Sequence, residues 1–212
     1  SAHPSPGNQR PRLWRLPRDR SICVHYGLPN DGADAVAQRM ADYTDAVPVG
    51  INLVNTNRGV GAKPSTSDEI LDDYARSAQR LAEHAAYLMV NLSCPNTEDG
   101  RDFFSSAERI DDLLSRLETG TGSTPVFLKV SPDWDLRSID ALVETAARYD
   151  RVAGFMFNLS SKRREGLATP RSVWQDLPGA ISGPPTKAWM NNRVGQLYQR
   201  IDHRRFKIIS AG

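Results

Sequence analysis

The sequence predicts an α/β fold, and within that class it favours a (β/α)8 TIM barrel over an open sheet. Short apolar runs rich in β-branched residues alternate along the chain with amphipathic segments of helical period, which is typical of a parallel sheet covered by helices. Four successive expected strands also end in a polar side chain: Asn52, Asn91, Lys129 and Asn158. In a (β/α)8 barrel such strand ends converge on the active site, although a polar residue there can also merely begin a loop.

Five short apolar runs are expected to form the strands. They span residues 47–54, 87–93, 125–131, 152–160 and 206–212. The first, "VPVGINLV", is rich in β-branched residues, which suits a strand buried on both faces. This periodicity alone does not separate an open doubly wound sheet from a closed barrel.

The expected helices lie between these runs. The first follows the loop "NTNRGVGAKPS", and Thr66 with Glu69 makes a capping box at its start. Its apolar side chains then recur at helical spacing on one face: Ile70, Leu71, Tyr74, Ala75, Ala78, Leu81, Ala82 and Ala85. Leu113, Leu114 and Leu117 mark the second helix, residues 136–149 form the third, and residues 187 to 202 form the fourth after a loop rich in Lys, Arg, Gly and Pro.

The composition indicates one globular domain over residues 1–212, with a Pro-rich extended arm at 1–12. A net charge of +2 is too small to argue for nucleic acid or for a membrane surface. No apolar run approaches the roughly 18 residues of a membrane span, and no signal peptide opens the chain. Two cysteines make no disulfide framework and lack metal-type spacing, so we expect a reducing, cytoplasmic compartment.

Several common catalytic motifs are absent from the sequence. It has no glycine-rich dinucleotide or phosphate loop, no HExxH and no GxSxG. Its histidines, His3, His25, His84 and His203, are scattered without ligand spacing. We therefore expect no metal site, while a Ser-His-Asp triad has no motif in its favour.

The strand ends instead offer amides, a lysine and a thiol. Amide donors and acceptors in fixed places suit the edge of a planar polar heterocycle, and Lys129 can hold negative charge on a reduced ring. Cys94, where the second strand becomes a loop, can serve as a general base if its thiolate is populated near neutral pH. The alternative is a small buried hydrophobe, which is the commoner role of an arbitrary cysteine.

These residues resemble the dihydroorotate dehydrogenase family, FMN enzymes built on a (β/α)8 barrel. The most specific segment is "NLSCPNT" (91–97), which is similar to the family's N-[VLI]-S-[SC]-P-N segment. "RPRLWRLPRDRSICVHYGL" (10–28) resembles the arm of the membrane-linked, quinone-using class. Further segments match in the family's order: "VGINL" (49–53), "VFLKVSPD" (126–133), "AGFMFNLSS" (153–161), "AISG" (180–183) and "KIISAG" (207–212).

The resemblance assigns roles by position. The expected flavin-site residues are Asn52, Asn91, Lys129, Asn158 and Gly183. The expected substrate residues are Asn96, Thr97 and Ser160. Cys94 falls on the position of the base, which in the family removes a proton from C5 of dihydroorotate while a hydride leaves C6 for flavin N5. The quinone class ordinarily carries serine there and the soluble class cysteine, so this chain combines features of both.

Two positions depart from the family pattern. Val24 stands where the family has an asparagine that binds orotate, and Leu159 stands where it has a second one. A one-residue shift of the alignment gives that second role to Asn158 instead. Because each lost hydrogen bond to a buried polar substrate costs about 1–3 kcal/mol, these changes favour a different ring as the substrate.

The family's first strand and its eighth strand have no counterpart in this sequence. We therefore expect exposed sheet edges unless other segments or a partner complete the barrel. The leading function is oxidation of dihydroorotate or a related dihydropyrimidine, with a quinone as electron acceptor and a cytoplasmic location, peripheral membrane association being the alternative. The other hypotheses are a non-catalytic or divergent flavin-binding paralogue that serves as a structural subunit, and a fragment without activity of its own.

Overall fold

The structure, a computed structural model, describes residues 1–43, 47–93 and 103–210. Its larger sheet has five parallel strands in the order β3-β4-β5-β6-β8. The strands are β3 (Gly50–Leu53), β4 (Tyr87–Asn91), β5 (Val126–Val130), β6 (Val152–Phe157) and β8 (Lys207–Ile209). Each lies inside one of the runs expected to form a strand, so the alternation read from the sequence is confirmed.

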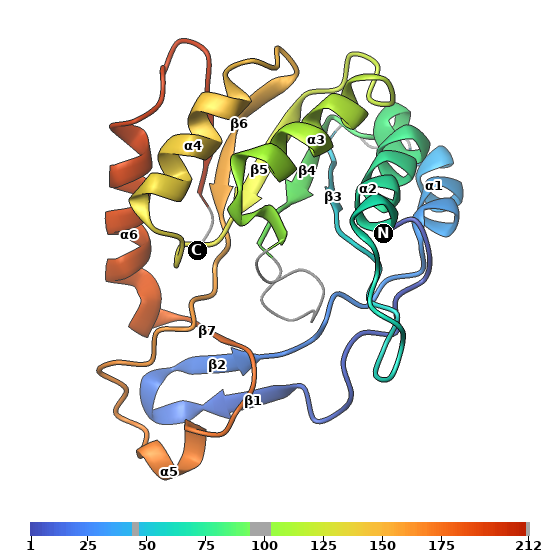
Figure 1. The fold of residues 1–212 in the computed structure, drawn as a ribbon. Helices are drawn as coiled ribbons and strands as arrows, with labels where there is room; N and C mark the ends of the chain where they lie inside the picture. The colour runs from blue at the N-terminus through green and yellow to red at the C-terminus, as the bar shows by residue number, and fades with distance from the viewer. Residues whose placement is uncertain (44–46, 94–102, 211–212) are drawn as a thin grey trace.

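Helices connect these strands and surround the sheet in an arc (Figure 1). They are α1 (Ala33–Ala41), α2 (Ser67–Leu81), α3 (Ala107–Glu118), α4 (Leu136–Ala146) and α6 (Pro184–Tyr198). The short helix α5 (Arg171–Trp174) lies outside this arc (Figure 1). Short 3-10 helices lie at Pro17–Asp19, Ala82–His84 and Phe103–Ser105. Helix α6 begins three residues before the expected start at 187, because Pro184 and Pro185 form its first turn, where proline needs no hydrogen-bond partner.

The chain therefore has an α/β fold whose parallel sheet corresponds to part of a (β/α)8 barrel. Within the described residues the sheet does not close on itself, and β3 and β8 are its edges. Every connection inside the sheet carries a helix across the same side, as parallel pairing requires. This agrees with the expected (β/α)8 barrel that lacks its first and last strands, because β3 and β8 are left as sheet edges among the described residues.

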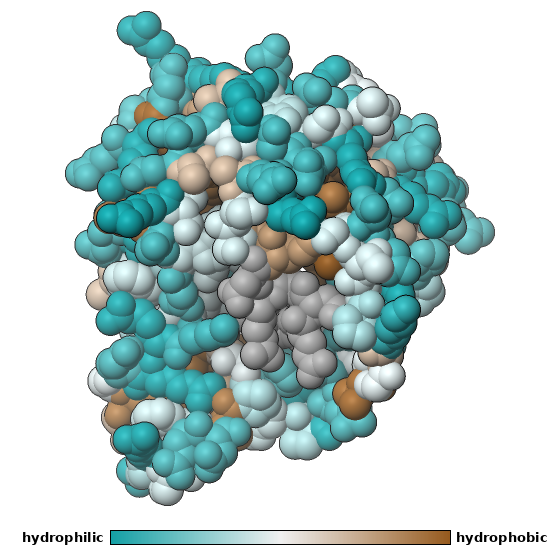
Figure 2. Space-filling view, in the orientation of Figure 1, coloured by the Kyte–Doolittle hydropathy of each residue, from teal (hydrophilic) through white to brown (hydrophobic). Residues whose placement is uncertain are grey.

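The hydrophobic core fills the space between the sheet and the helices. Alternate residues of each strand point to it, for example Leu88 and Val90 of β4 and Leu128 of β5, all 0% exposed. The helices contribute their apolar faces at the expected spacing, and Leu142 of α4 is likewise 0% exposed. By contrast, the outer face seen in Figure 2 is mostly hydrophilic, with hydrophobic residues in small groups.

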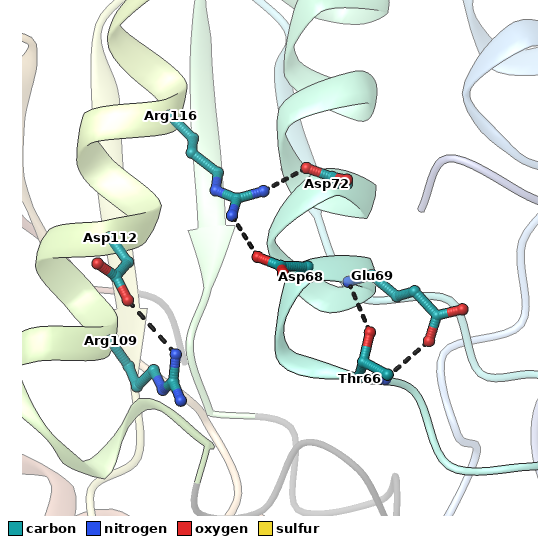
Figure 3. Close-up of polar contacts among 7 residues, drawn as sticks. All are labelled: Thr66, Asp68, Glu69, Asp72, Arg109, Asp112 and Arg116. Carbon is teal, nitrogen blue, oxygen red and sulfur yellow. Dashed lines mark hydrogen bonds and ion pairs between the residues drawn. The ribbon is translucent and has the colours of Figure 1, made fainter.

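The expected capping box at the start of α2 is confirmed. The Thr66 hydroxyl accepts a hydrogen bond from the Glu69 backbone N–H at 3.3 Å, and the Glu69 carboxylate accepts one from the Thr66 N–H at 2.7 Å (Figure 3). Next to it, Arg116 of α3 binds Asp68 at 2.5 Å and also Asp72, both on α2. These surface ion pairs orient the two helices, although each exposed pair stabilises by less than about 1 kcal/mol.

A second sheet was not predicted from the sequence. It is antiparallel, with the order β1-β2-β7, and consists of β1 (Leu13–Leu16), β2 (Ser21–Val24) and β7 (Ala180–Ser182). It lies at the carboxyl ends of the parallel strands, because Ser161, beyond β6, bridges Ile181 of β7, and Asn57, beyond β3, donates to the Gly27 carbonyl at 2.9 Å. The small sheet therefore stands over the end of the barrel where the expected site lies (Figure 1).

The arm at 1–12 is irregular apart from one bridge between Ser5 and Asn30. Its start is anchored by Asp73 of α2, whose carboxylate accepts the backbone N–H of Ala2 at 2.6 Å and that of Thr56 at 2.9 Å. Asp73 is 7% exposed, and its hydrogen bonds satisfy it in that buried place. This buried carboxylate joins the arm to the loop that leaves β3.

The turn between β1 and β2 is tied to the loop before α5 through Asp19. Its carboxylate accepts hydrogen bonds from the N–H of Ala168 at 2.6 Å, and from the N–H and hydroxyl of Thr169 at 3.0 and 2.5 Å. Desolvation acts to raise the pKa of Asp19, but the hydrogen bonds from Thr169 and Ala168 outweigh it and hold the pKa below its usual value.

We predict that Asp19→Asn removes a stabilising contribution that depends on pH. A lowered carboxylate pKa stabilises the fold above the ordinary pKa of 3.8, and the contribution disappears as the pH falls through the lower value of the folded state. Denaturant unfolding at pH 6 and at pH 3 should therefore show a wider gap between wild type and Asp19→Asn at pH 6. An equal gap at both pH values would mean that this carboxylate is not held by its hydrogen bonds.

Candidate ligand site at the carboxyl end of the parallel sheet

One face of the parallel sheet turns away from the helices, and its carboxyl end is polar. Asn91 of β4 lies in register with Lys129 of β5. Asn52 of β3 lies in register with Met89, two residues before Asn91 on the same strand. Register partners and residues two apart share a face, so Asn52, Asn91 and Lys129 lie on one face of the sheet.

Asn91 is held in place by several hydrogen bonds. It is 4% exposed, and its side-chain oxygen accepts hydrogen bonds from the N–H of Ser93 at 3.1 Å and from the Ser93 hydroxyl at 3.3 Å. Its carbonyl accepts the Tyr74 hydroxyl at 2.6 Å. Asn91 and Tyr74 thus fix the direction in which the chain leaves β4. This role of Tyr74 could not be predicted, because helical spacing assigns Tyr74 only to the core.

Asn158 continues the same face beyond β6. Its backbone N–H donates to the Val130 carbonyl at 2.7 Å, which extends the pairing with β5 by one step. It follows Met156, the register partner of Lys129, by two residues. The alternation of strand side chains therefore places Asn158 on the same face as Met156 and Lys129, two residues further toward the carboxyl end.

The same face is apolar nearer the amino end. The rings of Tyr87 and Phe127 meet edge to face, with centroids 5.3 Å apart. Gly50 lies beneath Tyr87, since a Cβ at Gly50 would lie 2.0 Å from the Tyr87 ring. Met89 is 6% exposed between these rings and the amides. The face is thus apolar near the amino end of the strands. At the carboxyl end it carries a polar row that consists of Asn52, Asn91, Lys129 and Asn158.

The loops beyond β5 and β6 are joined by a carboxylate. Asp133 accepts the Ser161 hydroxyl at 2.5 Å and the Lys162 N–H at 2.8 Å. Ser160, an expected substrate residue, is half-buried directly before Ser161. The structure therefore holds Ser160 near the polar row, while Asp133, which had no predicted role, fixes the loop.

Gly183 lies apart from the row of strand ends. It precedes α6 with φ 118°, a conformation that favours glycine. A Cβ there would lie 3.0 Å from the Arg20 carbonyl oxygen and 3.2 Å from the Ser21 Cα. The absence of a side chain thus lets the start of α6 pack closely against the β1–β2 hairpin.

Three expected site residues, Cys94, Asn96 and Thr97, lie outside the described residues. The other cysteine, Cys23, is 1% exposed in β2, and burial raises the pKa of its thiol while Arg164 acts to lower it. Its thiol donates to the Pro178 carbonyl at 3.2 Å, so Cys23 packs the small sheet.

The two positions that depart from the expected pattern carry apolar side chains near this end of the sheet. Val24 ends β2 in register with Ala180 of β7. Leu159 is 38% exposed directly after Asn158. Neither side chain can hydrogen-bond a polar ligand.

One further polar residue at the strand ends was not predicted. Asn55, two residues after the end of β3, is 8% exposed, and its side-chain nitrogen has no hydrogen-bond partner in the described part of the chain. A buried amide without a partner costs about 1–3 kcal/mol, so its place calls for a functional account. Elsewhere among the described residues, no group of three His, Cys, Asp or Glu could hold a metal ion, and no helix has the length and hydropathy to span a membrane.

Known proteins resemble the whole of this chain. The family model described as "Dihydroorotate dehydrogenase" matches residues 1–212. Proteins named "Dihydroorotate dehydrogenase (quinone)" are 37% identical in Mycobacterium sp. (strain KMS) and 38% identical in Mycobacterium ulcerans, each over 212 residues. These alignments cover 100% of this chain and 56% of each relative, so the chain spans about half the length of the curated relatives it matches.

Solved structures confirm the fold. The ligand-free DHODH of Eimeria tenella superposes with a TM-score of 0.81 at 21% identity, covering 100% of this chain and 64% of that one. The complex of the Eimeria tenella DHODH with ferulenol superposes with a TM-score of 0.81 at 21% identity, covering 99% of this chain and 60% of that one. From the match of the family model over all of residues 1–212, we conclude that this chain belongs to the dihydroorotate dehydrogenase family.

Proposed function

We propose that this chain forms the flavin-binding domain of an FMN-dependent oxidoreductase that oxidises dihydroorotate or a related dihydropyrimidine. The observation that carries the proposal is the polar row on the open face of the sheet, where Asn91 and Lys129 are register partners. This row occurs in a chain of the dihydroorotate dehydrogenase family. Membership of the family supports the proposed reaction. The polar row is the site where we propose that FMN binds.

The residues of the row fit FMN by their chemistry. An isoalloxazine ring has a polar edge of donors and acceptors and two apolar faces. The amides of Asn52, Asn91 and Asn158 each offer a donor and an acceptor to such an edge. Lys129 offers a positive charge that stabilises a reduced, anionic ring. We also assign Gly183 to the cofactor site, because the segment "AISG" (180–183) matches the family's pattern.

When bound, FMN would supply a two-electron acceptor for the hydride that leaves C6 of the substrate. Cys94 removes the proton from C5 as the general base, which leaves a carbon–carbon double bond in the ring. A free thiol has a pKa of about 8.5, and a cation close to a thiol increases its thiolate fraction. Asn96, Thr97 and Ser160 bind the polar edge of the substrate and orient it.

A quinone is the electron acceptor that we propose for the second half of the reaction. The support is the printed name of the mycobacterial relatives, which are quinone enzymes, together with the similar arm at 10–28. Since quinones reside in membranes, we propose a cytoplasmic protein that contacts a membrane peripherally.

A second candidate is a paralogue that acts on a different dihydropyrimidine. Val24 and Leu159 favour it, because both are apolar at positions where the family binds orotate through asparagines. Two lost hydrogen bonds at about 1.4 kcal/mol each would weaken orotate binding by roughly a hundredfold.

The two candidates are separated by anaerobic reduction of the FMN-loaded protein. We expect the flavin absorption band to bleach when dihydroorotate is added. Bleaching with dihydrouracil or dihydrothymine but not with dihydroorotate would establish the second candidate. If FMN stays bound and oxidised with all three compounds, the chain is a non-catalytic flavin-binding relative and the proposed reaction is wrong.

A further inference from the structure

A cavity of about 440 Å³ lies between the arm, the β1–β2 hairpin and the loop that leaves β3. Its described lining includes Arg10, Trp14, His25, Asn55 and Arg58. None of these residues belongs to the set assigned above to flavin, substrate or proton transfer. The cavity therefore offers a different set of residues at the same end of the sheet.

The charge of this cavity is positive. Arg10 is exposed and has no ion-pair partner among the described residues. Arg58 approaches Glu69 at 3.6 Å, but both side chains are more than 40% exposed, at 42% and 47%. Such exposed pairs are weak in water. No aspartate or glutamate is present in the described part of the lining.

Asn55 adds a hydrogen-bond donor to the lining. The comparison with its neighbour Asn57 is informative, because the side-chain nitrogen of Asn57 donates to Asn8 at 3.0 Å and to the Gly27 carbonyl at 2.9 Å. Its oxygen accepts the Gly59 N–H at 3.0 Å. Asn57 therefore stabilises the wall of the cavity. Among the described residues, by contrast, the side-chain nitrogen of Asn55, which is 8% exposed, has no hydrogen-bond partner.

The wall that carries Asn55 is fixed in place. The next residue, Thr56, donates its N–H to the buried carboxylate of Asp73 at 2.9 Å, and its hydroxyl accepts the His3 N–H at 3.4 Å. On the outer side, Gly61 turns with φ 79°, and a Cβ there would meet nothing within 4 Å. The cavity thus combines a rigid inner wall with an open rim.

We propose that this cavity binds the oxyanion group of a small ligand, either a carboxylate or a phosphate. Within the part of the chain that the structure describes, Arg10 at the rim has no ion-pair partner, and the Asn55 side-chain nitrogen in the wall has no hydrogen-bond partner. An oxyanion accepts hydrogen bonds from both groups. Trp14 supplies a flat apolar wall for the rest of the ligand. The proposal does not depend on the flavin reaction, since it uses other residues.

Binding is tested by titrating the protein with inorganic phosphate and with benzoate, and following tryptophan fluorescence. We expect a saturable change with at least one probe. Saturation with phosphate alone assigns a phosphate ligand, saturation with benzoate alone assigns a carboxylate, and saturation with both assigns a general oxyanion site. Trp14→Phe should remove the change, since Trp14 lines the cavity.

Variants locate the site. Arg10→Gln and Asn55→Ala should each weaken binding about tenfold, which is ~1.4 kcal/mol. The matched control is Arg137→Gln, an exposed arginine of α4 outside the cavity lining, and it should bind like wild type. Arg10 is exposed, so its variant remains informative even if Asn55→Ala fails to fold. Absence of saturation with both probes, or equal weakening by Arg137→Gln and Arg10→Gln, would overturn the proposal.

Discussion

Replacing Cys94 by alanine is expected to slow the reduction of bound flavin by about a hundredfold or more while FMN stays bound. A positioned general base contributes roughly 10²–10⁴ to a rate, and alanine offers no group that accepts a proton. The flavin contacts assigned to Asn91 and Lys129 do not involve the thiol. Anaerobic stopped-flow mixing with the substrate measures the rate, and the flavin absorption spectrum measures occupancy.

The other cysteine provides the matched control for this experiment. Cys23 is 1% exposed in the small sheet, and burial raises the pKa of its thiol. Cys23→Ser keeps a donor for the Pro178 carbonyl and should reduce flavin at the wild-type rate. In wild type the rate should rise with pH as the Cys94 thiol ionises, and this rise should be absent in Cys94→Ala. An unchanged reduction rate in Cys94→Ala would remove the thiol from the mechanism.

Truncating Phe155 to alanine is expected to lower the free energy of unfolding by about 3–5 kcal/mol. Phe155 is 0% exposed in the middle of β6, and the centroid of its ring lies 5.1 Å from the centroid of the Phe206 ring. It is in register with Leu128 of β5 and with Ile208 of β8. The loss of this ring leaves a cavity at the centre of the sheet that supports the polar row.

The stability change is measured by denaturant unfolding of the variant and of a surface control. Val173→Ala, at a side chain 53% exposed in α5, should change the free energy of unfolding by less than about 0.5 kcal/mol. A loss below about 1 kcal/mol in Phe155→Ala would show that the sheet does not depend on packing at this point.

The parallel sheet could be predicted from the sequence because its signals are local. Each strand is a short apolar run, and Thr66 with Glu69 marks the start of α2 within four residues of chain. Helix α1 was missed, since it begins after Gly32 without a side-chain cap. The small sheet was missed because β2 pairs with β7, as in Cys23 with Ile181, across most of the chain. No pattern within one sequence reports such a distant pairing.

The polar row could be predicted for the same reason as the sheet. Strand alternation and parallel register are sufficient to place Asn91 beside Lys129. That the Asn55 side-chain nitrogen has no hydrogen-bond partner among the described residues could not be predicted, because this depends on which groups surround it in the folded protein. The contact of the Tyr74 hydroxyl with the Asn91 carbonyl is likewise set by how α2 packs on β4.

The most direct test of the central claim is a crystal structure of the protein grown with FMN. The polar row should then contact the isoalloxazine ring, with the Lys129 ammonium and the Asn91 side chain within hydrogen-bond distance of its polar edge. FMN bound elsewhere on the molecule, or a crystal saturated with FMN that shows none at the carboxyl end of the sheet, would contradict the account.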